Sequence, residues 1–305
     1  MQSKKEAGLN FIKNFYIDFM CPYCKEKMHL EGESLKCVNK HTFDITKKGT
    51  INFIISSKIK ESKIYNEKLF SCRRKFIENG YYNGIYELIA EDINNLNLDN
   101  IKILDLGCGE GIHSINVLNK IKNDYRYFGF DYSKDAINLA SDYNSSNRFY
   151  FTGDVNNIPI ANDSIDVIID FLSPYSELEV KRVLKKGGLF IKIAPSSDYL
   201  IELRNANGLE KYQKQQEIIE NLSKYFKNIV TENYRKTFKI EKDDVVNLIG
   251  MTPLKLNMTN LEIEQITIDL NMYKVTVWFI YEGTQNLEKT KHSIGYALIG
   301  VNYGK

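Results

Sequence analysis

The sequence predicts an α/β protein in which an open, mostly parallel sheet of seven strands follows a small metal-binding module. Three observations predict this. A glycine-rich turn follows a buried strand within residues 101–111, and later apolar runs each end in an acidic residue or glycine. Three cysteines and a histidine are clustered within residues 21–41. Strands that alternate with helices are typical of parallel sheets, and such Cys/His pairs are typical of structural zinc sites.

Bulk composition bounds the class of protein. A chain of 305 residues, 43% of them hydrophobic, fits one large globular domain or two smaller ones. No apolar run approaches the ~18 residues of a membrane span. The first fifteen residues lack the apolar core and cleavage site of a signal peptide. We therefore expect a cytoplasmic protein with no membrane contact.

Charge is distributed unevenly along the chain. The net charge is only +2, yet residues 1–75 carry 16 Lys and Arg against 8 Asp and Glu. A basic N-terminal portion fits a polyanionic partner that is bound at that end. Lysines spread over every surface would explain the same numbers, so composition leaves both interpretations open.

The N-terminal cysteines have the spacing of a zinc site. Two residues separate Cys21 from Cys24, twelve more precede Cys37, and three separate Cys37 from His41. Thiolates and imidazole suit tetrahedral zinc, and four protein ligands make a closed, structural site. Free thiols beside an unrelated histidine are the alternative.

Short strands are expected between and after these ligands. The predicted strands cover Ser34–Cys37, Thr42–Ile45 and Thr50–Ile54. They form a zinc-ribbon-like module of about forty residues, which is too small to fold without its metal. We place the module at residues 20–60, after an N-terminal lead at residues 1–19.

A helical connector is expected over residues 61–95, with a break at Asn79 and Gly80. Arg73, Arg74 and Lys75 form a basic cluster near this break. The cluster either contacts RNA phosphates or is simply a solvated helix face.

The most informative stretch begins with a buried strand over Ile101–Leu104 and continues into a helix from Ile112. Between them, Gly107, Gly109 and Gly111 alternate with other residues, and Asp105 lies two residues before the first glycine. Glycine is needed where the backbone approaches a ligand or adopts positive φ. This spacing resembles class I S-adenosylmethionine-dependent methyltransferases more than the G-x-G-x-x-G of nicotinamide enzymes.

Later segments agree with that resemblance. Asp131 closes the next strand, 20 residues beyond Gly111, where a carboxylate can accept hydrogen bonds from ribose hydroxyls. Asp154 and Val155 follow the strand Phe149–Phe151, where the methyltransferase fold usually contacts adenine. Gly187 and Gly188 are expected to cap a helix before the strand Leu189–Ile193.

The C-terminal part completes the sheet. A helix is expected over Leu209–Phe226, and the sixth and seventh strands over Val230–Phe238 and Tyr273–Ile280. An insertion at about 240–270 is expected to carry two short helices, at Asp243–Leu248 and near Asn260–Gln265. The resemblance thus implies a Rossmann-like methyltransferase domain spanning residues 96–305, with the insertion beside the acceptor pocket.

Taken together, these motifs resemble one family closely, the guanine-N1 methyltransferases of 23S ribosomal RNA. The matching text is CPYC, CVNKHTFD, KKGTINFI, CRRKFIENGYY, ILDLGCGEG and, at residues 250–253, GMTP. The resemblance implies zinc on the four N-terminal ligands and S-adenosylmethionine in contact with Tyr82, Gly109 and Glu110. Tyr199 stands where the family is expected to have a histidine, and residues from Thr284 onward extend past the expected end.

The resemblance also implies the chemistry. Guanine N1 carries a proton at neutral pH, so a base or stabilisation of O6 should assist the transfer. Asp170 ends the predicted strand Ile165–Asp170, and our hypothesis is that it accepts this proton or binds the guanine edge. Its alternative role is to cap a helix or hold a loop.

The expected function is methylation of guanine N1 in a 23S rRNA hairpin held by the zinc module. The alternatives are a related methyltransferase for a small molecule or another substrate, and a cofactor-binding assembly factor without catalysis. The sequence leaves both a monomer and a homodimer open.

Overall fold

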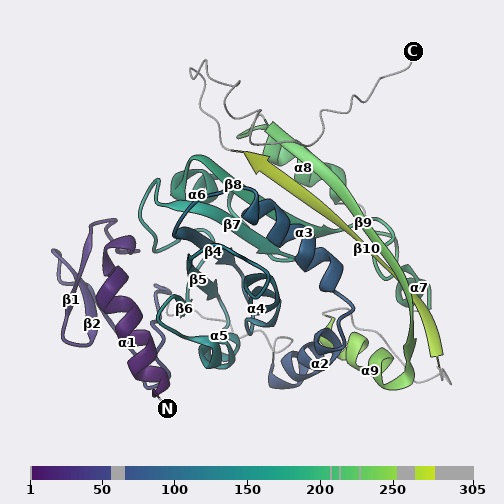
Figure 1. Ribbon diagram of the computed structural model, residues 1–305, viewed down its shortest axis with the longest axis horizontal. Coiled ribbons are helices and arrows are strands. Elements are labelled where there is room, and N and C mark those ends of the chain that lie inside the picture. The colour runs from purple at the N-terminus through teal and green to yellow at the C-terminus, as the bar shows by residue number, and fades with distance from the viewer. Residues whose placement is uncertain are drawn as a thin grey trace.

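A computed structural model describes residues 2–55, 66–206, 208–212, 214–226, 228–252 and 265–278. Its centre is a seven-stranded sheet with strand order β6-β5-β4-β7-β8-β10-β9 (Figure 1). The strands are parallel except β10, which runs antiparallel to β8 and β9. This confirms the predicted α/β sheet. Its strands are β4 Ile101–Leu106, β5 Tyr125–Asp131, β6 Arg148–Thr152, β7 Ile165–Phe171, β8 Leu184–Pro195, β9 Asn228–Glu241 and β10 Gln265–Trp278.

Both faces of the parallel strands β4 to β8 are largely buried, as expected for parallel strands, whereas the edge strand β9 is mostly exposed. One face, with Ile103 and Val167, packs under helices α3 and α4. The other, with Phe128 and Phe151, packs against the N-terminal segment. Most side chains of the central strands therefore lie in one of two cores.

Helices connect the strands and cover the sheet. The predicted helical connector is present and is broken at Asn79 and Gly80 as expected, since α2 ends at Glu78 and α3 starts at Asn83. Helices α2 and α9 pack against each other near one end of the sheet (Figure 1). The helices of this part are α2 Glu67–Glu78, α3 Asn83–Asn94, α4 Ile112–Leu118, α5 Lys134–Ala140, α6 Glu177–Val183, α7 Ile201–Ala206, α8 Gln215–Ser223 and α9 Lys242–Met251.

Two elements differ from the sequence prediction. Gly187 does not follow a helix end: α6 ends at Val183, and Gly187, with φ +76°, lies inside β8. A glycine inside a strand marks an irregularity in pairing, and the register of β7 with β8 shifts between Ile165 and Val167. The helix expected over 209–226 is present but shorter, as α8 Gln215–Ser223, and it is preceded by α7 Ile201–Ala206, which was not predicted; Gly208, with φ +63°, lies between the two. The expected helix near 260–265 lies outside the described residues, apart from its last residue, which begins β10.

The first nineteen residues, for which no element was predicted, contain helix α1 Lys4–Phe15 and a 3₁₀ turn, η1 Tyr16–Asp18. Ser3 caps the helix and forms a reciprocal capping box with Glu6. The ring of Phe11 packs against Phe128 and Phe149 of the sheet. This segment is therefore part of the core that covers one face of the sheet.

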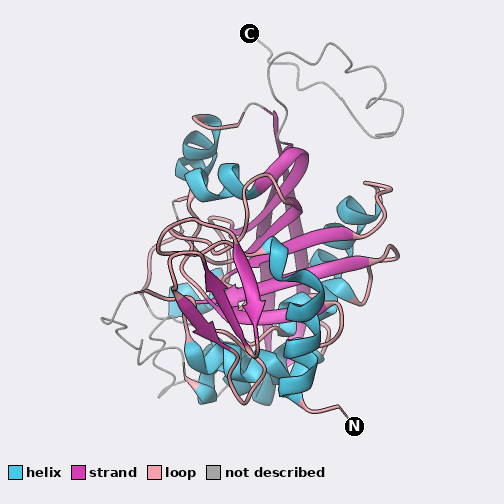
Figure 2. Cartoon of the chain, turned by 90° about the vertical axis from the view of Figure 1, so that its left-hand side faces the viewer, coloured by secondary structure: helices cyan, strands magenta, loops and turns pink. Residues whose placement is uncertain are grey.

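The metal module is a three-stranded antiparallel sheet in the order β1-β2-β3, seen on the left of Figure 1 and facing the viewer in Figure 2. Its strands are β1 Met28–Glu31, β2 Ser34–Cys37 and β3 Thr42–Asp44. The last two were predicted and the first was not. The expected strand over 50–54 is reduced to single bridges, from Ile51 to Ile45 and from Asn52 to Thr152 of β6.

None of the helices in the described part of the chain has the length and apolar character needed to cross a membrane.

Candidate active site and metal centre

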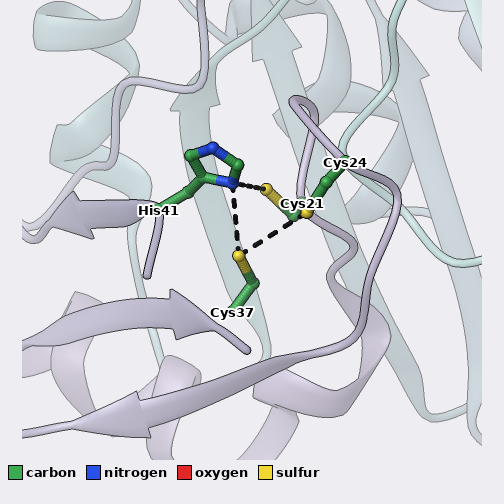
Figure 3. Close-up of side chains that lie close together, drawn as sticks. All are labelled: Cys21, Cys24, Cys37 and His41. Carbon is green, nitrogen blue, oxygen red and sulfur yellow. Dashed lines mark hydrogen bonds between the residues drawn. The ribbon is translucent and has the colours of Figure 1, made fainter. Parts of the chain in front are cut away.

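The four predicted metal ligands converge on one point (Figure 3). Their ligand atoms all lie within 4.8 Å of one another. His41 Nδ1 is 3.5 Å from Cys21 Sγ and 3.4 Å from Cys37 Sγ, and Cys24 Sγ is 3.6 Å from Cys37 Sγ. Zn–S bonds of about 2.3 Å in a tetrahedron separate two sulfurs by about 3.8 Å. The donor set and its spacing therefore fit a four-coordinate zinc ion.

Two tight turns hold these ligands. The backbone N–H of Lys25 donates to the carbonyl of Cys21, and that of Lys40 donates to the carbonyl of Cys37. Lys25 and Lys40 both adopt positive φ, 62° and 63°. A hydrogen bond with Asn39 is the main cause that lowers the pKa of Cys24 to about 6, whereas burial raises the pKa of Cys21 to about 11. Zinc binding requires both thiols to lose their protons.

A cavity of about 1010 Å³ lies at the carboxyl ends of the parallel strands. Ligands bind at this edge in open α/β sheets, where the strand order reverses. Most of the cofactor residues predicted from the sequence line it: Tyr82, Asp105, Gly107, Gly109, Asp131, Asp154, Val155 and Tyr199.

The glycine loop is shaped by backbone geometry. Gly107, Gly109 and Gly111 adopt positive φ of 65°, 58° and 82°. A Cβ on Gly107 would lie 2.6 Å from the Cβ of Ser173, and one on Gly111 would lie 3.1 Å from the ring of Tyr143. Gly111 thus packs behind the loop and does not line the cavity.

Two carboxylates, those of Asp131 and Asp105, line the cavity beside the glycine loop. Asp131 accepts a hydrogen bond from the backbone N–H of Gly109 at 3.0 Å, and burial raises its pKa. Asp105 accepts from Ser114 and, at 2.9 Å, from Tyr127, while its second oxygen, Oδ1, is buried without a partner. Burial raises the pKa of Asp105 to about 7. An unpaired buried carboxylate oxygen beside a cavity fits a cationic group of a ligand.

Comparison with known proteins agrees with this geometry. Residues 97–265 match the model of a family described as a methyltransferase domain, and residues 19–63 match a model described as the N-terminal part of RlmA. A putative 23S rRNA (guanine-N1) methyltransferase of Bacillus subtilis is 37% identical over 61% of this chain and 67% of the relative. The chain belongs to the 23S rRNA guanine-N1 methyltransferase family. It is an S-adenosylmethionine-dependent methyltransferase with a zinc ribbon.

More distant relatives carry related names. A 23S rRNA (guanine(748)-N1)-methyltransferase of Streptomyces fradiae is 24% identical over 79% of this chain and 86% of its own. A putative 23S rRNA (guanine-N1) methyltransferase of Micromonospora griseorubida is 21% identical over 76% and 85%. The family resemblance predicted from the motifs is confirmed.

The methyltransferase cavity has an aromatic wall. The hydroxyls of Tyr82 and Tyr199 lie 2.9 Å apart, and burial raises the pKa of both phenols. His113 also lines the cavity, with its ring stacked on Phe171 at 4.2 Å and its Nδ1 2.7 Å from the hydroxyl of Tyr86. Burial holds the pKa of His113 well below its usual range. The wall is therefore uncharged at neutral pH. Sequence reasoning missed His113, although its place directly after the glycine loop was a signal.

Asp170 does not line the methyltransferase cavity. Its side chain is fully buried, accepts a hydrogen bond from Lys192 Nζ at 2.8 Å and accepts another from Ser173 Oγ at 2.8 Å. Burial is the main cause that raises its pKa. The hydroxyl oxygen of Ser173 also lies 2.5 Å from the carbonyl oxygen of Leu106, so its single proton is shared between Asp170 and Leu106. The contacts of Asp170 agree with the loop-holding alternative, because they hold Ser173 beside Gly107, and Ser173 and Pro174 line the cavity.

Arg73 does not lie on a solvated helix face, which was one of the two roles considered for the basic cluster. Its side chain is only 17% exposed, and Nη1 lies 3.1 Å from Oε2 of Glu110. Glu110, predicted to touch the cofactor, does not line the cavity and instead contacts Arg73, which does. The guanidinium of Arg74 lies over the ring of Tyr143 at 5.9 Å.

Proposed function

We propose that this methyltransferase transfers a methyl group from S-adenosylmethionine to N1 of a guanine in 23S rRNA. The observation that carries the proposal is the RlmA-type zinc ribbon packed against the cofactor sheet of the same chain. Three similar proteins are named as 23S rRNA guanine-N1 methyltransferases, two of them as putative ones.

The cavity lining supports one orientation of the cofactor. We propose that the carboxylate of Asp131 accepts hydrogen bonds from the ribose hydroxyls and that the Asp154–Val155 segment contacts adenine, because all three residues line the cavity. The amino-acid end then lies at the glycine loop, near Asp105 and the Tyr82–Tyr199 pair. The unpaired Oδ1 of Asp105 is placed to accept hydrogen bonds from the ammonium group.

The acceptor base would enter beside Ser173 and Pro174, where β7 ends. Bound S-adenosylmethionine supplies a methyl group on a positively charged sulfur. Transfer joins the methyl carbon to N1, breaks the carbon–sulfur bond and requires the N1 proton to leave. Because the aromatic wall is neutral, the protein contributes mainly alignment and exclusion of water.

The zinc module offers a surface that suits RNA. Tyr23, on the turn between two zinc ligands, is 52% exposed, and its ring stacks on the ring of His41 at 4.7 Å. Lys40 is exposed on the second ligand turn, and Lys27 is exposed just after the first. An exposed aromatic ring among lysines suits an unpaired base and its phosphate. We propose that residues 20–60 bind the RNA, that residues 61–95 connect this module to the catalytic domain, and that residues 96–305 form the domain that catalyses methyl transfer.

This surface lies close to the cofactor cavity. Lys25 Nζ donates to Oδ1 of Asn157, and Asn157 Nδ2 donates to the carbonyl of Pro22 at 3.0 Å. Asn157 directly follows the cavity-lining residues 154–156. RNA held at the zinc turns would therefore lie beside the cavity mouth.

The proposal is tested by transfer of labelled methyl from S-adenosylmethionine to 23S rRNA that lacks this modification. We expect label in 1-methylguanosine after digestion to nucleosides, and none with 16S rRNA as the matched control. Label in a different nucleoside would contradict the proposed N1 target. Absence of label, from protein that binds both zinc and cofactor, would contradict RNA as the substrate.

Cofactor binding is expected to strengthen as the pH rises through about 7, the value to which burial raises the pKa of Asp105. Below this pH the carboxyl is protonated and cannot pair with the ammonium group. Affinity for S-adenosylhomocysteine should fall about tenfold per pH unit there. Titration calorimetry between pH 6 and 8 measures the change. An Asp105→Asn variant should lose the dependence, and a variant that retains it would refute the assignment.

A further inference from the structure

Arg73 reaches from the connector helix α2 to the glycine loop. Its guanidinium lies so close to the loop that a Cβ on Gly109 would be 3.1 Å from Nη1. It lines the same cavity as Asp105 and Tyr82, and the bond to Glu110 uses one of its five N–H groups. A largely buried guanidinium with donors to spare beside a ligand cavity suits an anion.

Three cationic side chains line the cavity within the described residues: Arg73, Lys134 and Arg204. Lys134 is exposed at the start of α5, close in sequence to Asp131 and hence at the ribose end. Arg204 donates to the carbonyl of Tyr199 through Nε and to the carbonyl of Glu210 through Nη1. Arg73 is the cation that contacts the residues of the glycine loop.

We propose that Arg73 binds the α-carboxylate of the methionine part of the cofactor. The inference rests on the cofactor placement proposed above. The amino-acid end of the cofactor is a zwitterion, and the cavity offers it opposite charges on two sides: the guanidinium of Arg73 for the carboxylate and Asp105 Oδ1 for the ammonium. The planar guanidinium matches a carboxylate through two parallel hydrogen bonds.

Glu110 then acts as a positioning residue. Its side chain is almost fully buried, and its bond to Nη1 fixes the plane of the guanidinium. The side chain of Arg73 also lies over the ring of Phe70 at 5.5 Å, which restricts it from the other side. Glu110 therefore affects the cofactor through Arg73.

The test compares two ligands that differ in the amino-acid end. S-Adenosylhomocysteine carries it and 5′-methylthioadenosine lacks it. For Arg73→Met we expect the Kd of S-adenosylhomocysteine to rise roughly 30- to 1,000-fold, the usual loss for a truncated buried charge pair. The Kd of 5′-methylthioadenosine should stay within about threefold of wild type. Arg74→Met, next to it in sequence but placed over Tyr143 outside the cavity lining, is the matched control and should change neither.

Equal losses for both ligands would overturn the proposal, because they would show a general structural role for Arg73. No loss for either would overturn it too. If Arg73→Met fails to fold, Arg73→Lys decides by the same comparison, since it keeps the charge but loses the paired hydrogen bonds. If the wild-type protein binds both ligands with equal affinity, the proposed placement of the cofactor is contradicted. These binding measurements are independent of the assay for 1-methylguanosine in RNA.

Discussion

A Cys37→Ser variant is expected to lose zinc and with it the folded N-terminal module. Cys37 is buried, and its thiolate is one of four closely spaced ligands. Structural zinc contributes about 10–16 kcal/mol to the folding of small zinc modules, so losing one ligand should cost at least about 3 kcal/mol. Metal analysis and thermal unfolding of the full chain measure the two effects.

Cys72→Ser is the matched control for this variant. Cys72 lies in α2, outside the ligand cluster, and packs against Gly250 of α9. It should retain one zinc ion per chain and unfold close to the wild-type midpoint. Stoichiometric zinc and an unchanged midpoint in Cys37→Ser would contradict the assignment of a structural metal.

The second large effect is expected at Asp18, which ties the N-terminal segment to the sheet. Asp18 is only 3% exposed and pairs with Lys102 Nζ and Arg126 Nη1, each at 2.6 Å. An Asp18→Ala variant leaves two partly buried cations without their partner, which typically costs about 3–5 kcal/mol. Urea unfolding followed by circular dichroism measures the loss.

Asp142→Ala provides the comparison, because Asp142 pairs with Lys4 of α1 on the exposed surface. Exposed pairs contribute about 0–1 kcal/mol. If Asp18→Ala loses no more stability than Asp142→Ala, the buried pairs do not anchor the segment.

Features encoded by adjacent residues were predictable from the sequence. The apolar runs of β4 to β7 and the glycine spacing at 107–111 depend on local geometry, and the structure places them as expected. Helix α1 carried an equally local signal, the pairing of Ser3 with Glu6, which the sequence reasoning passed over.

Features that depend on distant contacts were not predictable. The basic cluster at 73–75 was compatible with an exposed helix face, but packing of α2 against α9 and α4 turns Arg73 toward Glu110. Asp170 is the penultimate residue of β7, near the predicted edge of the sheet, yet a lysine from the neighbouring strand, Lys192, holds its carboxylate inside. The contact between Tyr82 and Tyr199 joins residues 117 positions apart. No local pattern specifies such pairs.

The segment that follows the zinc module, Ile51–Phe53, affects how readily the protein aggregates in concentrated solution. Thr152 of β6 donates its N–H to the carbonyl of Ile51 and accepts from the N–H of Phe53, so the segment occupies an edge of the sheet. Open strand edges are templates on which chains pair and aggregate. If loss of zinc releases this segment, the edge strand β6 becomes open to pairing with another chain. The zinc ion would then protect the protein against aggregation in addition to stabilising the fold.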